Sequence, residues 1–200
     1  MALTLLLAAL LAEAGGRPLF YWGARRPVIV APAAAEAGVE AQVLEVHAAR
    51  DGGDLVLRFT LDRPVREAIR LPDGAPISGR LRAVLYVDAD DDRRTGWDQG
   101  PGDLRTGADA RLDLGAVSIG EDPEEKRPAG AVVSATLYSL TIEGRRRTLW
   151  RGDDDSEPQR VSAHGEWVEL RVPTDAFQVS PRARLILAAA DGPHDGRLEP

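Results

Sequence analysis

The sequence contains no cysteine. This absence excludes disulfide bonds, thiolate metal ligands, a lipid-anchor cysteine and a cysteine nucleophile. Lys126 is the only lysine, so nearly all the positive charge is arginine, and Met1 is the only methionine. Aromatic residues make up just 5% of the chain.

Excess positive charge is also missing. The formal net charge is −7 at pH 7, which argues against a nucleic-acid partner because neutralising phosphates requires a basic face. An acidic balance fits cation binding or simple solubility better. With 200 residues, of which 44% are hydrophobic and 28% charged, the chain has the composition of one globular domain.

The only notable apolar run is the N-terminal stretch from Leu3 to Leu11, which is too short to span a bilayer comfortably. It is followed by the A-x-A pattern Ala12-Glu13-Ala14. We interpret residues 1–14 as a signal peptide, although the usual positive n-region is missing, and expect a secreted or periplasmic protein. An uncleaved apolar leader or a buried first helix is the alternative. Residues 15–38 are expected to be a linker.

Helical periodicity is weak throughout the remaining chain, whereas short segments of alternating or β-branched character are frequent. In Asp54–Leu61, for example, Leu55, Leu57, Phe59 and Leu61 alternate with polar or smaller residues. The pattern predicts an all-β fold, an antiparallel β-sandwich of jelly-roll or immunoglobulin-like type with few or no helices beyond the leader. This domain is expected over residues 39–195, with a short tail at 196–200. The predicted strands are Val39–Ala48, Asp54–Leu61, Leu81–Val87, Ala108–Leu114, Val132–Ile142, Arg146–Trp150, Trp167–Val172 and Arg184–Ala190.

An acidic loop follows the apolar strand that ends at Val87, with Asp88, Asp90 and Asp92 in a D-x-D-x-D run. Residues two apart in an extended strand are roughly 6.6 Å apart, whereas two ligands of one calcium ion lie within about 5 Å of each other. The chain must therefore curl after Val87 for these carboxylates to share an ion, and aspartate tolerates such turns.

The EF-hand template does not apply to this loop. Arg93 occupies the position of its glycine, and Gln99 occupies the position of its bidentate glutamate. The remaining ligands must come from backbone carbonyls or a neighbouring strand, and Asp109, which opens the next alternating segment, is the candidate. The predicted metal ligands are therefore Asp88, Asp90, Asp92 and Asp109, with calcium in a structural role.

The loop also resembles a known signature. The stretch "LYVDADDDRRTGWD", Thr95-Gly96 and Gly107-Ala108-Asp109 are similar to β-sandwich domains related to the family-nine carbohydrate-binding modules and the DOMON-like group. "GEWVELRVPTDAF" at residues 165–177 resembles the family's late strand. The resemblance covers roughly residues 39–195, and it implies calcium in the loop and carbohydrate as the ligand.

Carbohydrate binding in that family relies on exposed aromatic platforms, which are scarce here. Trp97 in the acidic loop and Trp167 on a predicted strand are the candidate ligand-binding residues, and the alternative is that each is a packing residue. Haem, which some relatives bind, is not expected, because the only methionine, Met1, would leave with the leader.

The sequence therefore predicts an exported, non-catalytic binding module with a structural calcium site, carbohydrate as its ligand and no catalytic residues. Two alternatives remain open. One is a glycan-active enzyme domain of the same fold, and the other is a structural or partner-binding envelope protein. Neither nucleic acid nor a membrane span in the mature chain is expected.

Overall fold

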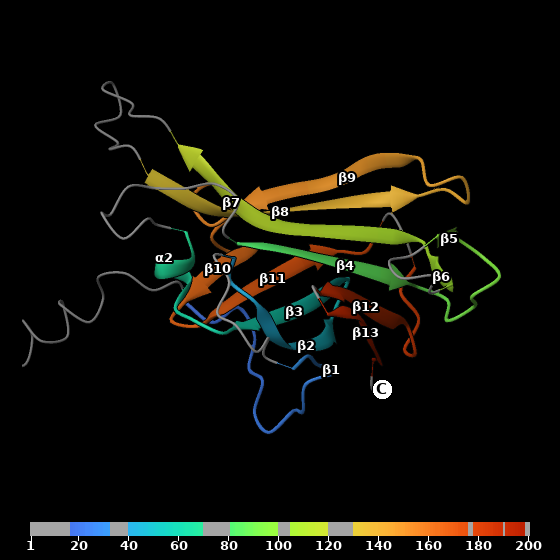
Figure 1. Ribbon diagram of the computed structural model, residues 1–200, viewed down its shortest axis with the longest axis horizontal. Helices are drawn as coiled ribbons and strands as arrows, with labels where there is room; N and C mark the ends of the chain where they lie inside the picture. The colour runs from blue at the N-terminus through green and yellow to red at the C-terminus, as the bar shows by residue number, and fades with distance from the viewer. Residues whose placement is uncertain are drawn as a thin grey trace, which may run out of the picture.

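A computed structural model shows two antiparallel β-sheets that pack against each other (Figure 1), which confirms the predicted all-β sandwich. It describes residues 17–32, 40–69, 81–99, 105–119, 130–175, 178–189 and 191–198. The predicted signal peptide, residues 1–14, lies outside these ranges.

The strands of the described residues form two large sheets and one small sheet. The five-stranded sheet has the order β1 (Ile29–Val30), β2 (Val43–Asp51), β3 (Asp54–Leu61), β11 (Trp167–Pro173), β10 (Val161–His164). The six-stranded sheet has the order β13 (Gly192–Arg197), β12 (Arg184–Ala189), β4 (Arg82–Asp88), β7 (Ala110–Ile119), β8 (Gly130–Leu140), β9 (Arg146–Asp153). The two-stranded sheet consists of β5 (Trp97–Gln99) and β6 (Arg105–Ala108).

Alternation along the strands builds the core between the two large sheets. In β3 the predicted apolar side is buried, with Leu57 and Phe59 fully enclosed in the main hydrophobic cluster. In β4 the same cluster takes Leu85 and Val87, while Tyr86 between them packs in a separate cluster on the other side of the strand. Each large apolar side chain buried in this way contributes about 1.5–3 kcal/mol.

Strand register places charged residues next to each other on the outer faces. On the five-stranded sheet, Glu169 of β11 is paired with Arg58 of β3. On the six-stranded sheet, Arg184 of β12 is paired with Asp88 of β4. The two outer faces therefore each carry an acid–base pair from neighbouring strands.

Residues 17–32, which belong to the expected linker, lie against the sandwich. Strand β1 pairs with β2, and Ile29 and Ala31 are buried in the main core. Trp22 is buried in a small separate cluster with Ala49 and Val56. The described part of this region therefore contributes to the folded domain.

Helix is minimal in the described chain. The only named helix there, α2 (Val65–Ala68), has four residues, and no helix of the described residues is long and apolar enough to cross a membrane. Strands β1, β5, β6, β10 and β13 were not predicted, because they are short or polar and carry little alternation.

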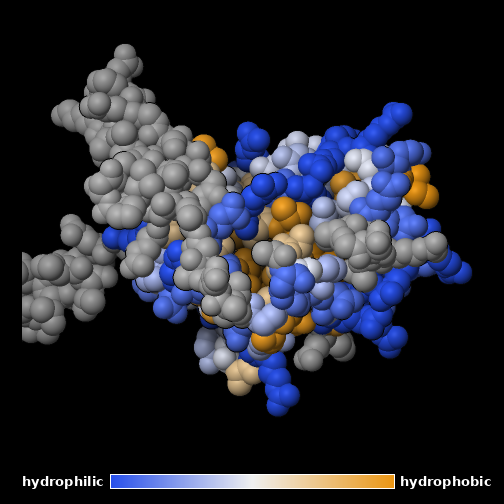
Figure 2. Space-filling view, viewed as in Figure 1, coloured by the Kyte–Doolittle hydropathy of each residue, from blue (hydrophilic) through white to orange (hydrophobic). Residues whose placement is uncertain are grey.

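Apolar side chains also reach the surface. Figure 2 shows a group of them near the middle of one face, bordered by hydrophilic residues. The structure has in addition a pocket of about 640 Å³ lined mainly by small apolar residues of both sheets, among them Ala41, Ala83 and Leu187. The pocket adjoins the gap in the described chain between residues 32 and 40.

Candidate metal centre

Asp88 is the last residue of β4 and has no exposed surface. Because Val87 points into the main core, the side chain of Asp88 points to the outer face of the six-stranded sheet. The β5–β6 hairpin lies over this end of the sheet. The Thr106 carbonyl of β6 accepts a 2.6 Å hydrogen bond from Arg184 beside Asp88. The hairpin thus encloses a carboxylate that the strand pattern would otherwise leave in solvent.

The chain curls directly after β4, as predicted for shared ligation. Asp91 adopts a positive φ of 58°, a conformation that aspartate tolerates better than most residues. The curl is held by Asp90, whose carboxylate accepts hydrogen bonds from the Asp92 amide at 2.9 Å and from the Thr95 hydroxyl at 3.0 and 3.1 Å. Asp90 is therefore held over the end of β4.

Asp109 lies between β6 and β7 and is held by three hydrogen bonds. Its amide donates to the Val87 carbonyl at 2.9 Å, its carbonyl accepts from Leu140 at 2.8 Å, and its Oδ2 accepts from the Ala89 amide at 2.8 Å. The side chain is thereby directed toward the start of the acidic loop.

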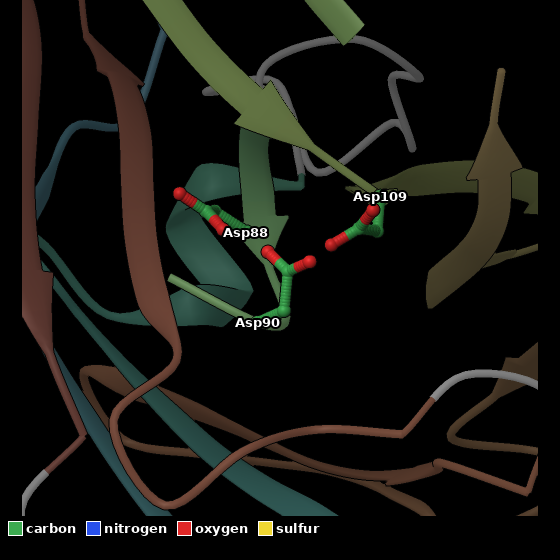
Figure 3. A group of neighbouring side chains, drawn as sticks. All are labelled: Asp88, Asp90 and Asp109. Carbon is green, nitrogen blue, oxygen red and sulfur yellow. The ribbon is translucent and has the colours of Figure 1, made fainter. Parts of the chain in front are cut away.

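Three of the four predicted ligands converge. Asp88, Asp90 and Asp109 each offer a carboxylate oxygen, and these oxygens all lie within 4.8 Å of one another. Figure 3 shows Asp90 between the other two, with an oxygen toward each. Ligands at about 2.3–2.6 Å from one calcium ion have this spacing.

Asp92 departs from the predicted four-carboxylate site. Its oxygens accept bonds of 2.8 and 2.9 Å from the Arg94 guanidinium, and Oδ1 also accepts the Arg94 amide. Arginine two residues away gives this carboxylate a local partner, which the spacing of the D-x-D-x-D run does not reveal. Asp92 contributes to the loop through its carbonyl, which accepts from Thr95.

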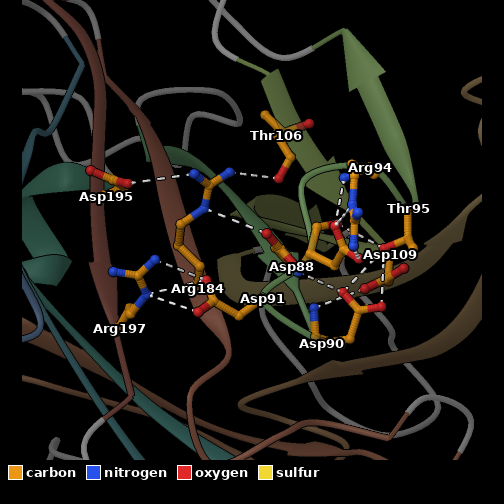
Figure 4. A network of polar contacts seen from close by, with 12 residues as sticks. Asp88, Asp90, Asp91, Arg94, Thr95, Thr106, Asp109, Arg184, Asp195 and Arg197 are labelled. Carbon is orange, nitrogen blue, oxygen red and sulfur yellow. Dashed lines mark hydrogen bonds and ion pairs between the residues drawn. The ribbon is translucent and has the colours of Figure 1, made fainter.

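Asp88 differs from its neighbours in having no hydrogen-bond partner. Both of its carboxylate oxygens are buried and accept no hydrogen bond. Arg184 forms an ion pair with it, in which Nε lies 3.6 Å from Oδ2 (Figure 4). Buried polar atoms are nearly always satisfied, and a buried carboxylate without donors is strongly disfavoured.

Electrostatics in the group follows from burial. Burial raises the pKa of Asp88 to about 6, with Arg184 acting in the opposite direction and Asp90 and Asp109 adding repulsion. Burial also raises the pKa of Asp109. By contrast, hydrogen bonds from Arg94 lower the pKa of Asp92 to about 2. The anionic forms of buried Asp88 and half-buried Asp109 are thus disfavoured, and a bound cation would reverse this.

Two glycines bring the loop against the hairpin. Gly96 has φ 65°, and a Cβ there would lie 2.6 Å from the carbonyl oxygens of Gly107 and Ala108. Gly107 has φ 57°, and a Cβ there would lie 2.6 Å from the Cα of Arg93. The close approach of these backbone segments needs a residue without a side chain at both positions.

The predicted aromatic ligands lie on opposite faces of the sandwich. Trp97 packs against the outer cluster of the six-stranded sheet, with its ring 5.4 Å from that of Tyr86. Trp167 lies on the outer side of β11, where its ring faces the guanidinium of Arg58 at 4.9 Å and the ring of His164 at 5.4 Å. The structure does not bring Trp97 and Trp167 into one site.

Arg184 and Thr95 belong to the neighbourhood of the site and were not predicted. Arg184 is separated from the acidic loop along the chain, and its only signal is a charge at the start of the apolar run "LILAAA". Thr95 belongs to the Thr-Gly pair that carries the resemblance, but its bond to Asp90 could not be read from the sequence.

The set of three carboxylates suits a hard cation such as Ca²⁺ or Mg²⁺, which prefers oxygen ligands. The chain has no cysteine, so softer thiolate chemistry is excluded. No family model, curated protein or solved structure matched the chain, so the resemblance to the family-nine carbohydrate-binding modules stays a prediction.

Proposed function

We propose that this chain is a non-catalytic binding module in which Asp88, Asp90 and Asp109 hold a structural calcium ion. The observation that carries the proposal is Asp88, a fully buried carboxylate whose oxygens accept no hydrogen bond and one of which lies within 4.8 Å of oxygens from Asp90 and Asp109. A divalent cation would supply the missing partner and relieve the repulsion among the three carboxylates.

The ion would act on the loop between β4 and β7. Asp88 ends one strand, and Asp109 immediately precedes the neighbouring strand. An ion bound by both would join the two ends of the loop, and a site that forms only in the folded chain adds its binding energy to stability.

A bound cation would also hold the three carboxylates ionised, which leaves none of them able to donate a proton. Glycoside hydrolysis needs one protonated carboxyl group. This supports a binding role over the alternative of a glycan-active enzyme using the same acidic group.

The direct test is calorimetric titration of calcium into chelator-treated protein. We expect saturable binding with one ion per chain, and magnesium should bind more weakly because it demands a more regular octahedral site. Asp88→Asn should abolish the binding, while Asp98→Asn, a change in the same loop outside the group, should leave it unchanged. Absence of calcium binding to the unaltered chain would refute the proposed function.

Carbohydrate is the proposed ligand of the module, with Trp97 as the contact residue. Its indole is half-buried and lies over Tyr86, and Gly144 leaves room for it, since a Cβ there would lie 2.7 Å from Nε1. Arg111, whose guanidinium lies 5.7 Å from the Tyr86 ring centre and donates to Asp113, places a planar polar group beside this ring. Aromatic and planar polar groups together suit the apolar and hydroxyl faces of a sugar.

Binding to a glycan array tests this part separately. Trp97→Ala should remove the signal, whereas Trp167→Ala, on the opposite face, should retain it. A signal that survives Trp97→Ala would move the ligand surface elsewhere, and no signal from the unaltered chain would leave the partner-binding alternative in place of the carbohydrate one.

A further inference from the structure

The N-terminal strap (residues 17–22) lies on the outer face of the five-stranded sheet, away from the acidic loop. It is held by side chains that project from β10 and β11. The Ser162 hydroxyl donates to the Arg17 carbonyl at 2.8 Å, and the Arg171 guanidinium donates to the Leu19 carbonyl at 3.0 Å. The strap thus meets the sheet through its own backbone.

Both backbone polar groups of Leu19 are hydrogen-bonded to side chains of β11. Its amide donates to Glu169 Oε2 at 2.5 Å, while its carbonyl accepts from Arg171. Glu169 and Arg171 are two residues apart on β11, so both project to the same outer face. The strap bends at Leu19 and Phe20. Contacts to the backbone amide and carbonyl do not depend on the side chain of the residue that makes them.

Trp22 supplies the side-chain contact. Its indole N–H donates to Glu169 Oε1 at 2.5 Å, its ring centre lies 5.3 Å from the Arg58 guanidinium, and the side chain is 6% exposed. It packs on Ala49 and Val56 in a cluster of their own. The aromatic residue three positions after Leu19 is therefore the part of the strap that is recognised by its side chain.

The strands that receive the strap pair without it. The Trp22 cluster is separate from the main hydrophobic core. Among the described residues, no backbone–backbone hydrogen bond joins residues 17–22 to a strand, and β10, β11 and β3 pair through their own ladders. The strap is therefore held in the manner of a bound peptide.

Glu169 would keep its affinity for such a peptide when the strap is displaced. The carboxylate has no exposed surface and also accepts bonds of 2.6 and 2.8 Å from Arg58. Loss of the strap removes the Leu19 and Trp22 donors and leaves a carboxylate with acceptor capacity that an added peptide can fill. Arg171 likewise loses its carbonyl partner but stays in place through Asp51 at 2.6 Å.

We propose that the outer face formed by β3, β10 and β11 binds a peptide that has a tryptophan three residues after the residue held through its backbone, and that the strap is its occupant in cis. Glu169 and Arg171 hold the peptide backbone, and Glu169 with Arg58 holds the indole. This inference is independent of the proposed calcium site.

The strap competes with any added peptide, because a short tether gives an effective concentration on the order of millimolar. The test therefore uses a chain in which the strap cannot dock while the face formed by β3, β10 and β11 is unchanged. The double variant Leu19→Pro, Trp22→Ala lacks both the backbone amide that donates to Glu169 and the indole. The probe is a fluorescein-labelled peptide of residues 17–24, RPLFYWGA, followed by fluorescence anisotropy.

We expect saturable binding of the peptide to the double variant and at least tenfold weaker binding to the unaltered chain. The same peptide with alanine in place of tryptophan should bind at least tenfold more weakly. Adding Glu169→Gln to the double variant should abolish binding, whereas adding Glu166→Gln, a change at an exposed neighbour, should not.

Equal peptide binding by the Glu169→Gln and Glu166→Gln variants would overturn the inference, and so would no binding to a folded double variant. Circular dichroism checks the fold of each variant. A double variant that does not fold also overturns it, since the strap would then be an integral part of the domain.

Discussion

Among the described residues, two carboxylates are completely buried, and they differ in how their oxygens are satisfied. Glu169 on the five-stranded sheet accepts hydrogen bonds from Leu19, Trp22 and Arg58. Asp88 on the six-stranded sheet accepts none and lies 3.6 Å from Arg184. Burial alone therefore does not separate the carboxylate of a structural ion pair from a candidate cation ligand, whereas the number of hydrogen-bond donors around each carboxylate distinguishes the two here.

The largest effect on stability is expected from substitution of Glu169, the carboxylate whose oxygens accept hydrogen bonds. Glu169→Ala removes the ion-pair partner of Arg58 and the acceptor of the Leu19 and Trp22 hydrogen bonds. The free energy of unfolding should therefore fall by about 3 kcal/mol. Urea denaturation at pH 7 measures it. Glu166→Ala, at an exposed position nearby, is the matched control and should change stability by less than about 0.5 kcal/mol. Equal effects of the two variants would mean that Glu169 is not a structural anchor.

Calcium should have the next largest effect on stability, through Asp88, the carboxylate that accepts no hydrogen bond. At a hundred times its dissociation constant, the ion should stabilise the folded chain by about 2.7 kcal/mol, and the midpoint of thermal unfolding should rise accordingly. Asp88→Asn should remove this response because it deletes a ligand charge. A response that persists in Asp88→Asn would exclude Asp88 as a ligand.

The pH dependence sharpens the comparison further. Since burial raises the pKa of Asp88 to about 6, the folded chain binds this proton more tightly than the unfolded chain does. Without calcium, stability should therefore fall as pH rises from about 4 to about 6, with a contribution from Asp88 of about 2 kcal/mol.

Denaturant unfolding across this pH range measures the effect. In Asp88→Asn the slope should be shallower, although Asp154, whose pKa burial also raises to about 6, should keep part of it. With calcium present, the stabilisation should shrink as pH falls below about 6, because protons compete for the ligands. An identical slope in Asp88→Asn would contradict the assignment.

The smallest effect is expected at Asp92. Its carboxylate is held by Arg94 at the surface, outside the converging group, so Asp92→Asn should retain the calcium response and the affinity of the unaltered chain. Calorimetric titration of the variant checks this. A tenfold loss of affinity would restore the four-carboxylate site expected from the sequence.

Sequence patterns predicted the fold where each strand has a clear inner and outer side. The predicted strand Asp54–Leu61 coincides with β3, because its alternating apolar residues fit only one burial pattern. Strand β13, with the sequence GPHDGR, gives no such signal, since none of its residues is a large apolar one that would mark an inner side.

The candidate site was predictable only in part, for a similar reason. The convergence of Asp88, Asp90 and Asp109 could be predicted, because the chain curls after the strand that ends at Asp88 and the neighbouring strand starts directly after Asp109. The loss of Asp92 depends on a local rotamer of Arg94, and the burial of Asp88 depends on a hairpin folding over the sheet. Glu169 has the alternation of a solvent-facing residue, and only the position of the strap makes it buried.

The paired glycines at 96 and 107 have a consequence for how this loop can vary. Since each backbone occupies the space in which the other's first side-chain carbon would stand, a single added methyl group at either position would separate the two segments. Such a change would displace Asp109, two residues after Gly107, without altering any acidic residue. Related chains could therefore keep every aspartate and still lose the ability to gather them around one point.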